Sequence, residues 1–222
     1  MKVRFLILLS IAVLSNLPAQ ELDTTPYILD HHQNRLDQFS REPIKTGQII
    51  FLGNSITEGG QWSDYFPDQD VLNRGISGDI AHGVFNRLDE IIERQPSKLF
   101  LLIGVNDLSK NIPESIVANK VDDILGRLQK GSPNTEIIVQ SILPVNDSLD
   151  DFPDHYKQYA VMITNQLYKQ ICRKRNIRFL NLYLSFLNDS GRMDPMYSYD
   201  GLHLNDKGYA LWVKILKKEG LM

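Results

Sequence analysis

The sequence predicts an α/β protein: a three-layer α/β/α sandwich around a central, parallel, five-stranded sheet. Two observations lead to this fold class. Short apolar segments alternate along the chain with longer segments of helical periodicity, which is typical of βαβ units with parallel strands. Several apolar segments are also uninterrupted, as at Leu99–Ile103, and this indicates strands that are buried on both faces.

The first half of the chain is expected to contain two helices and three strands. A helix at Tyr27–Ser40 precedes the first strand, Gln48–Gly53, which ends in a polar loop containing glycine. A second strand at Val71–Arg74 leads through another glycine loop into a helix at Asp79–Arg94. The third strand is the apolar run Lys98–Gly104. The second helix is supported by apolar residues that share one face: Ile80, Val84, Leu88, Ile91 and Ile92.

The second half repeats the alternation of helix and strand. We expect a helix at Pro113–Gly131, a strand at Thr135–Ile142, and a helix at Pro153–Asn176. A short strand at Ile177–Leu182 and a final amphipathic helix at Asn205–Glu219 complete the predicted fold. The last helix has one apolar face, formed by Tyr209, Trp212, Val213 and Leu216.

The N-terminus has the pattern of a signal peptide. Lys2 and Arg4 precede the apolar stretch Phe5–Leu14, which is too short to span a bilayer comfortably, and small, turn-prone residues follow at Ser15–Ala19. We therefore expect residues 1–19 to be a signal peptide and residues 20–222 to form a single domain. No later segment is apolar for long enough to cross a membrane, so no stable membrane insertion is expected once the signal is removed. The predicted location is the periplasm or the extracellular space.

The composition argues against nucleic acid as a partner and excludes an intrachain disulfide. The chain has 222 residues, is 42% hydrophobic and carries a formal net charge of −3, without a basic stripe that would indicate nucleic-acid binding. Cys172 is the only cysteine, so no intrachain disulfide can form. Because it lies in a periodic segment, we expect a buried structural thiol.

Three polar loops that contain glycine follow the first three predicted strands. These loops are Gly53–Ser55, Gly75–Gly78 and Gly104–Asp107. Ligands bind at the carboxyl ends of the strands in open parallel sheets, so the three loops are expected to meet at one edge and form a site. The segment Val145–Asp154 is expected to be a loop at the rim of this site.

Ser55 is the candidate nucleophile in the first loop. A serine hydroxyl needs a base within hydrogen-bond reach, and it benefits from a helix N-terminus that can stabilise an oxyanion. Its alternative role is to cap a helix. Two other motifs fail here: Thr57 replaces the second glycine of G-x-S-x-G, and no lysine follows the glycines as a phosphate loop requires.

Asp200 and His203 supply the matching base. A base histidine needs an acceptor on its second nitrogen, and a carboxylate three residues earlier in a turn can fold back to provide it. Of the other histidines, His82 is expected at most at the edge of the pocket. No functional role is predicted for His31, His32 and His155.

Oxyanion stabilisation is expected from the second and third loops. Gly78 is predicted to open a helix with its N–H directed into the cleft, and Asn106 to add a side-chain amide donor. Ordinary turn formation is the alternative for each residue alone. The occurrence of all three loops together favours a site.

These blocks resemble the SGNH hydrolases, also called GDSL esterases/lipases. Gly53-Asn54-Ser55-Ile56, Gly78, Gly104-x-Asn106-Asp107 and Asp200-x-x-His203 occur in the order of that family. The resemblance implies a flavodoxin-like sandwich in which Ser55 is the nucleophile and His203 the base, oriented by Asp200. It also implies an oxyanion hole made by the backbone N–H groups of Ser55 and Gly78 with the Asn106 amide.

Two positions depart from the family pattern, and one segment points to a branch within the family. Asn54 stands where an aspartate is usual and Ile56 where a leucine is usual, but neither change removes a catalytic group. Asn73–Asp79 is most similar to the platelet-activating-factor acetylhydrolase-like branch, which implies removal of small acyl groups, commonly acetyl.

The sequence therefore predicts an exported serine esterase that needs no metal or organic cofactor and acts on a small-molecule or glycan ester. An O-acetylated sugar is the first candidate substrate, with Trp62, Tyr197 and Tyr199 as a sugar-binding rim. A lysophospholipase or acetylhydrolase acting on lipid esters is the alternative. A glycan-binding module without activity is a further alternative, and the complete triad disfavours it. The oligomeric state stays open.

Overall fold

The computed structural model describes residues 22–149, 152–153 and 155–222. The expected signal peptide, residues 1–19, lies outside the described residues. Within those described ranges, none of the helices has both the length and the hydropathy that crossing a membrane requires.

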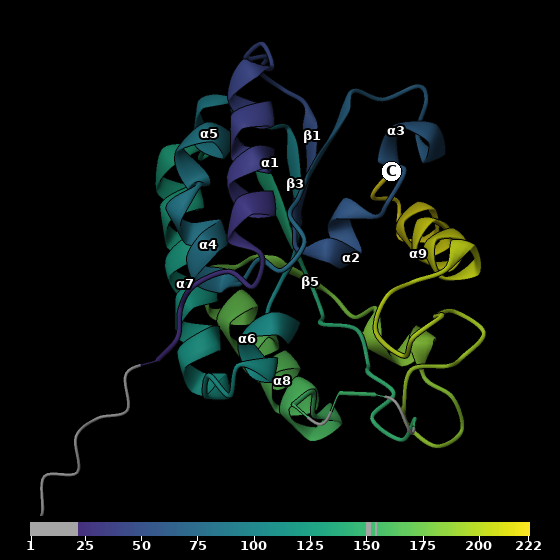
Figure 1. Ribbon diagram of the computed structural model, residues 1–222. Coiled ribbons are helices and arrows are strands. Elements are labelled where there is room, and N and C mark those ends of the chain that lie inside the picture. The colour runs from purple at the N-terminus through teal and green to yellow at the C-terminus, as the bar shows by residue number, and fades with distance from the viewer. Residues whose placement is uncertain (1–21, 150–151, 154) are drawn as a thin grey trace, which may run out of the picture.

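A five-stranded parallel sheet forms the centre of the molecule, as predicted (Figure 1). The strand order is β2-β1-β3-β4-β5, and every neighbouring pair is parallel. The strands are β1 Ile49–Gly53, β2 Val71–Gly75, β3 Lys98–Leu102, β4 Glu136–Gln140 and β5 Arg178–Leu180. Each lies within or close to its predicted range, so the α/β fold class and all five strands are confirmed.

Helices cover both faces of the sheet. In Figure 1, α1, α4, α5 and α7 lie on one side of the strands, and α3 and α9 lie on the other. The longer helices are α1 Leu29–Arg41, α4 Ala81–Asn86, α5 Leu88–Glu93, α7 Glu114–Gly131, α8 Gln158–Arg175 and α9 Asp206–Lys218. The short helices are α2 Ser55–Glu58, α3 Trp62–Tyr65, α6 Val105–Ser109 and the 3-10 helix η1 Tyr183–Phe186.

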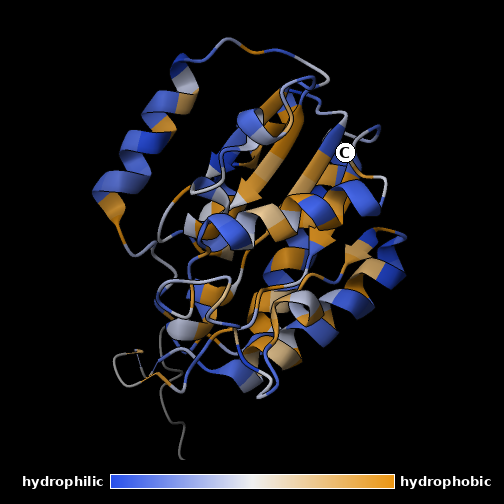
Figure 2. Ribbon diagram, turned by 90° about the vertical axis from the view of Figure 1, so that its right-hand side faces the viewer, coloured by the Kyte–Doolittle hydropathy of each residue, from blue (hydrophilic) through white to orange (hydrophobic). Residues whose placement is uncertain are grey.

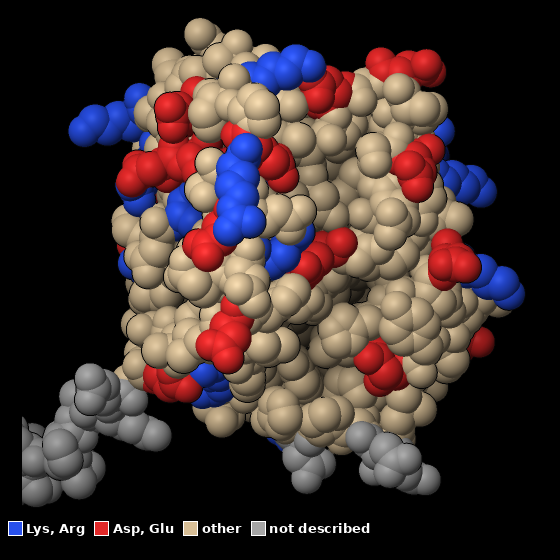
Figure 3. Space-filling model, turned by 45° about the horizontal axis from the view of Figure 1, so that its top comes forward, with Lys and Arg blue, Asp and Glu red and all other residues tan. Residues whose placement is uncertain are grey.

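The hydrophobic core is one continuous cluster that includes residues from both faces of the sheet. The strands are predominantly apolar, and the helices carry their polar residues outward (Figure 2). Acidic and basic side chains are mixed over the face of the molecule that Figure 3 shows. Towards α9, Phe51 stacks on Trp62 with ring centroids 3.9 Å apart, and Trp212 meets Trp62 edge-on at 4.8 Å. Trp62 is only 1% exposed, so its predicted place on a sugar-binding rim is wrong. Its ring instead packs in the core.

The single helix predicted at Asp79–Arg94 is two helices, α4 and α5, separated at Arg87. The Arg87 side chain is buried, and it donates hydrogen bonds to Asp79 and to the backbone carbonyls of Gly53 and Arg74. These partners lie on or after two different strands. The interruption therefore coincides with long-range contacts that the apolar periodicity of the segment does not reveal.

Helix α8 begins at Gln158 and not at the predicted Pro153. The Asp147 carboxylate accepts the backbone N–H of Gln158 at 3.2 Å and so satisfies one of the free donors of the first turn. Cys172 lies in this helix and is buried, as predicted.

Candidate active site

The strand register places three loops at one level of the sheet. Gly53 at the end of β1 pairs with Gly75 of β2 on one side and with Leu102 of β3 on the other. The chain therefore leaves all three strands at the same edge, and the predicted convergence of the three loops is confirmed.

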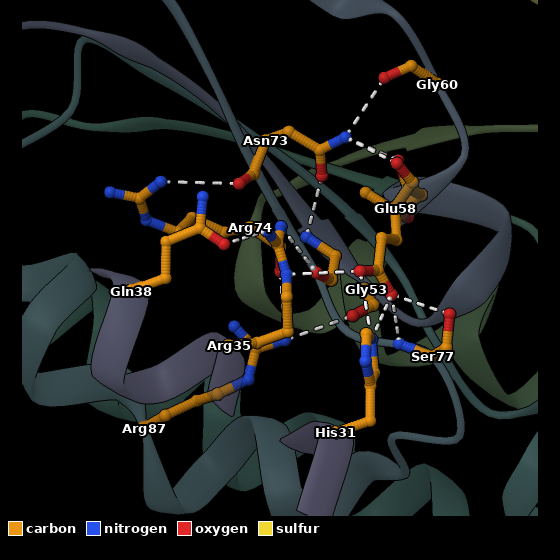
Figure 4. Close-up of polar contacts among 12 residues, drawn as sticks. His31, Arg35, Gln38, Gly53, Glu58, Gly60, Asn73, Arg74, Ser77 and Arg87 are labelled. Atoms are coloured by element: carbon orange, nitrogen blue, oxygen red, sulfur yellow. Dashed lines mark hydrogen bonds and ion pairs between the residues drawn. The ribbon is translucent and has the colours of Figure 1, made fainter. Parts of the chain in front are cut away.

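Ser55 is the first residue of α2, directly after β1. The Asn54 side chain caps this helix by accepting the Ile56 N–H at 3.1 Å, as an aspartate would. The other end is held by Asn73 of β2, whose side-chain amide donates to the carbonyls of Thr57, Glu58 and Gly60 (Figure 4). Helix α2, which carries Ser55, is thus fixed at both ends.

The close approach of α2 to β2 depends on a glycine. A Cβ atom at Gly75 would lie 2.1 Å from the Glu58 backbone nitrogen, so no side chain fits there. This contact brings Glu58, three residues after Ser55, against the loop that follows β2.

His203 and Asp200 complete a hydrogen-bonded chain with Ser55. The Ser55 Oγ lies 3.0 Å from His203 Nε2, and His203 Nδ1 lies 2.6 Å from Asp200 Oδ2. The structure therefore brings together the three residues that the sequence predicts as a triad. It is the arrangement in which an imidazole can take the serine proton while a carboxylate orients it.

The Asp200 carboxylate is set by the turn in which it lies. Its Oδ1 accepts the backbone N–H groups of Leu202 and His203 at 2.9 and 2.7 Å. Partial burial alone would raise the pKa of Asp200, but the hydrogen bonds from the His203 ring and from these backbone groups outweigh it and lower the pKa. The side chains of His203 and Asp200 are 37% and 46% exposed, so solvent reaches this end of the chain.

Gly78 lies in the turn before α4 and does not open that helix, which begins at Ala81; the predicted helix start is wrong. Its φ of 77° is in the left-handed region that favours glycine, and its carbonyl accepts the Tyr27 N–H at 2.9 Å. Among the described residues, no acceptor pairs with the backbone N–H of Gly78 or of Ser55. Both groups are therefore free to donate to an oxyanion.

Asn106 lies in α6, a short helix within the segment that was predicted to be a loop. The side chain is buried, and its Nδ2 donates to the Asp79 carbonyl at 2.9 Å, which leaves its second hydrogen free. The neighbouring Asp107 caps α4 by accepting the Ala81 N–H. Burial raises the pKa of Asp107 to about 7.

The rim contains residues from the loop predicted at Val145–Asp154. Asn146 donates its backbone N–H to the Gly201 carbonyl at 2.9 Å, so this loop lies against the turn that carries Asp200 and His203. Tyr199 is 72% exposed, whereas Tyr197 packs edge-on against Phe186. Of the three aromatic residues expected at the rim, Tyr199 alone has a largely exposed ring.

Several supporting residues escaped the sequence analysis. Asn73, on β2, and Arg87, at the junction of α4 and α5, hold the segment that carries Ser55. His31 and His32, for which no role was predicted, lie 3.0 Å from Glu58 and 3.4 Å from Asp79. The adjacent histidines and the acid three residues after Ser55 were visible in the sequence, but nothing there showed that they meet.

Comparison with known proteins identifies the family of this α/β fold. The GDSL-like lipase/acylhydrolase family model matches residues 51–211, so the chain belongs to this family of carboxylic ester hydrolases. A search of curated proteins gave no match. Within the described residues, no group of three or more histidine, cysteine, aspartate or glutamate residues could hold a metal ion.

Solved structures support the same fold. A candidate platelet activating factor from Streptococcus pneumonia is 26% identical with a TM-score of 0.77, covering 87% of this chain and 94% of the other. A GDSL-like lipase from Bacteroides thetaiotaomicron is 21% identical with a TM-score of 0.71, covering 86% and 98%. An acetyl xylan esterase is 18% identical with a TM-score of 0.66, covering 78% and 98%.

Proposed function

We propose that this protein is an exported serine esterase that removes a short acyl group, foremost acetyl, from an O-acetylated carbohydrate. The hydrogen-bonded chain from Asp200 through His203 to Ser55 carries the proposal, since it joins groups that are 148 residues apart in sequence. Such a chain converts a weakly nucleophilic hydroxyl into an attacking group.

The proposed reaction proceeds through an acyl-enzyme. His203 Nε2 takes the Ser55 proton as Oγ attacks the ester carbonyl, and the oxyanion accepts hydrogen bonds from the N–H groups of Ser55 and Gly78 and from the Asn106 amide. The C–O bond to the alcohol then breaks, and the alcohol leaves with the proton from His203. Water loses a proton to His203 as it attacks the acyl-enzyme, and the carboxylic acid is released as Ser55 regains its proton.

Two features support a carbohydrate substrate: an exposed aromatic residue at the rim of the candidate site and the signal peptide predicted at the N-terminus. Tyr199 offers an exposed ring in the turn that carries Asp200, which suits stacking against a sugar. The leader predicted at residues 1–19 would bring the enzyme into contact with glycans outside the cytoplasm. A structural neighbour is named as an acetyl xylan esterase, so the same fold accommodates an acetylated sugar polymer.

A lipid ester is the second candidate substrate. Tyr27 and Ile28 are 44% and 49% exposed, and atoms of both lie within 3.3 Å of where a Gly78 Cβ would stand. An apolar surface next to a candidate oxyanion donor suits an acyl or alkyl chain. A catalytically silent glycan-binding module is disfavoured, because such a module would not need an assembled triad.

The test compares mature wild type with Ser55→Ala and with Ser63→Ala, which changes an exposed serine of α3. Hydrolysis of p-nitrophenyl acetate, butyrate and octanoate is measured, followed by acetate release from acetylated xylan and from a short-chain acetylated phospholipid. We expect Ser55→Ala to lose nearly all turnover, Ser63→Ala to match wild type, and acetate to be the preferred acyl group.

Each result has a distinct consequence. Acetate release from xylan supports the carbohydrate assignment, whereas preference for octanoate or the phospholipid favours the lipid alternative. Full activity in a correctly folded Ser55→Ala variant would overturn the proposed mechanism.

A further inference from the structure

Glu58 lies at the centre of a polar cluster beside the 76–79 loop, which contains the candidate oxyanion donor Gly78. It is the last residue of α2, and its carboxylate, 19% exposed, accepts the Ser77 backbone N–H at 2.5 Å and the Ser77 hydroxyl at 2.6 Å. From α1, His31 Nε2 lies 3.0 Å from both carboxylate oxygens and Arg35 Nε lies 3.1 Å from one (Figure 4). One carboxylate thus joins α1, α2 and the loop after β2.

Ser77 immediately precedes Gly78, so contacts at Ser77 bear on the candidate oxyanion donor. The loop is held at three successive residues: at Ser77 by Glu58, at the Gly78 carbonyl by Tyr27, and at the Asp79 carbonyl by Asn106. Gly78 itself has wide backbone freedom, and its local sequence does not fix the direction of its N–H. These external contacts must do so.

The anchoring helix lies outside the part of the chain that matches the family model. The matched segment begins at residue 51, whereas α1 comprises Leu29–Arg41. The support of Glu58 by His31 and Arg35 is therefore built from residues that precede the matched segment.

The charge of Glu58 suits this role. Partial burial would raise the pKa of Glu58, but hydrogen bonds from Ser77 and His31 and the nearby Arg35 outweigh it and lower the pKa. The carboxylate is then ionised at neutral pH, so it can accept the two Ser77 hydrogen bonds and attract the Arg35 guanidinium.

We propose that Glu58 is a positioning residue of the esterase. Held by His31 and Arg35, its carboxylate fixes Ser77 so that the Gly78 N–H points to the oxyanion. This inference rests on the proposed function. It predicts that loss of Glu58 lowers kcat with little effect on KM, because the oxyanion forms only after the substrate has bound.

Glu42 provides a matched control. Glu42 and Glu58 both line a polar cavity of about 370 Å³, and Glu42 pairs with Arg74 at 2.6 Å. Among the described residues, its side chain makes no hydrogen bond to the 76–79 loop. The cavity also lets water reach the space that a truncated Glu58 would leave, so Glu58→Ala is expected to fold.

The experiment measures kcat and KM for p-nitrophenyl acetate with Glu58→Ala, Glu58→Gln, Glu42→Ala and Ser55→Ala. Removing a direct oxyanion donor costs about 10²–10³ in kcat, so displacing one should lower kcat about tenfold to a hundredfold. We expect this loss in Glu58→Ala, with KM within about twofold of wild type. Glu58→Gln should retain more activity because its amide oxygen can still accept the Ser77 N–H. Glu42→Ala should resemble wild type.

The outcomes separate the two proposals. If Ser55→Ala is inactive while Glu58→Ala keeps the kcat of Glu42→Ala, the positioning role is refuted and the proposed function stands. If Ser55→Ala remains active, the proposed function itself fails. Should Glu58→Ala not fold, Glu58→Gln and Ser77→Ala replace it: a lower kcat at unchanged KM in either supports the role, and wild-type kcat in both overturns it.

Discussion

Replacing Asp200 by asparagine should harm turnover more than replacing it by alanine. Asp200 Oδ2 lies 2.6 Å from His203 Nδ1, while its Oδ1 accepts two backbone N–H groups of the same turn. In Asp200→Asn, the side-chain amide oxygen still accepts the two backbone N–H groups. The amide NH₂ then takes the place of Oδ2 and faces His203 Nδ1. The ring must then carry its proton on Nε2, which faces Ser55, and it cannot act as a base.

The expected loss of kcat differs between the two variants, because Asp200→Asn imposes the wrong tautomer on His203 whereas Asp200→Ala only removes hydrogen bonds. A wrong histidine tautomer costs about 10⁴ in kcat. Asp200→Ala instead loses one charge-assisted hydrogen bond, worth about 1.5–3 kcal/mol or roughly 10- to 150-fold. It also loses two turn hydrogen bonds, but water can replace these partners because the Asp200 side chain is 46% exposed. We therefore expect Asp200→Asn to be slower than Asp200→Ala by about tenfold or more.

The assay measures kcat for p-nitrophenyl acetate in each variant. The rate of Ser55→Ala is subtracted as the hydrolysis that does not depend on the triad. The ¹⁵N shifts of the His203 ring report which nitrogen carries the proton in each variant. If Asp200→Ala is as slow as Asp200→Asn, or slower, then the position of the turn, and not the His203 tautomer, determines the loss of kcat. That result would refute the prediction.

Two further predictions follow from shifted pKa values. The pKa of Glu58 is lowered in the folded state, so its stabilising contribution is present above the unfolded value of about 4.3 and is lost as pH falls through the folded pKa. The stability gap between wild type and Glu58→Gln in urea unfolding should therefore be full at pH 7 and close towards pH 3; a constant gap would contradict this. Cys172 is 1% exposed and burial raises its pKa to about 12, so a thiol-specific disulfide reagent at pH 8 should label no thiol in the native protein and one after unfolding. Rapid labelling of the native protein would show that α8 opens.

The sheet and the meeting of its loops could be predicted from sequence because both depend on local patterns. Continuous apolar runs such as Leu99–Ile103 mark buried strands, and parallel strands align their carboxyl ends. Ser55 and His203 could be paired on chemical grounds and by the family resemblance, because a serine nucleophile needs an imidazole base that has its own acceptor.

The details that failed involve partners outside the segment from which each was predicted. The helix break at Arg87 coincides with contacts to Gly53 and Arg74, and the start of α8 coincides with a hydrogen bond from the Gln158 N–H to Asp147. Trp62 was expected at a rim, but it stacks on Phe51. In each case a tertiary contact overrode the preference that the local sequence expressed.

The two sides of the candidate site are built differently, and the difference has functional consequences. The oxyanion side is tied to a buried ion pair, Arg87–Asp79, whose side chains are 5% and 0% exposed. The base side is a turn in which His203 and Asp200 are 37% and 46% exposed. Oxyanion stabilisation depends on donors that do not reorganise during the reaction, whereas a base must accept and release a proton within one turnover. Changes on the oxyanion side should therefore affect stability and kcat together, and changes in the exposed turn should affect kcat much more than stability.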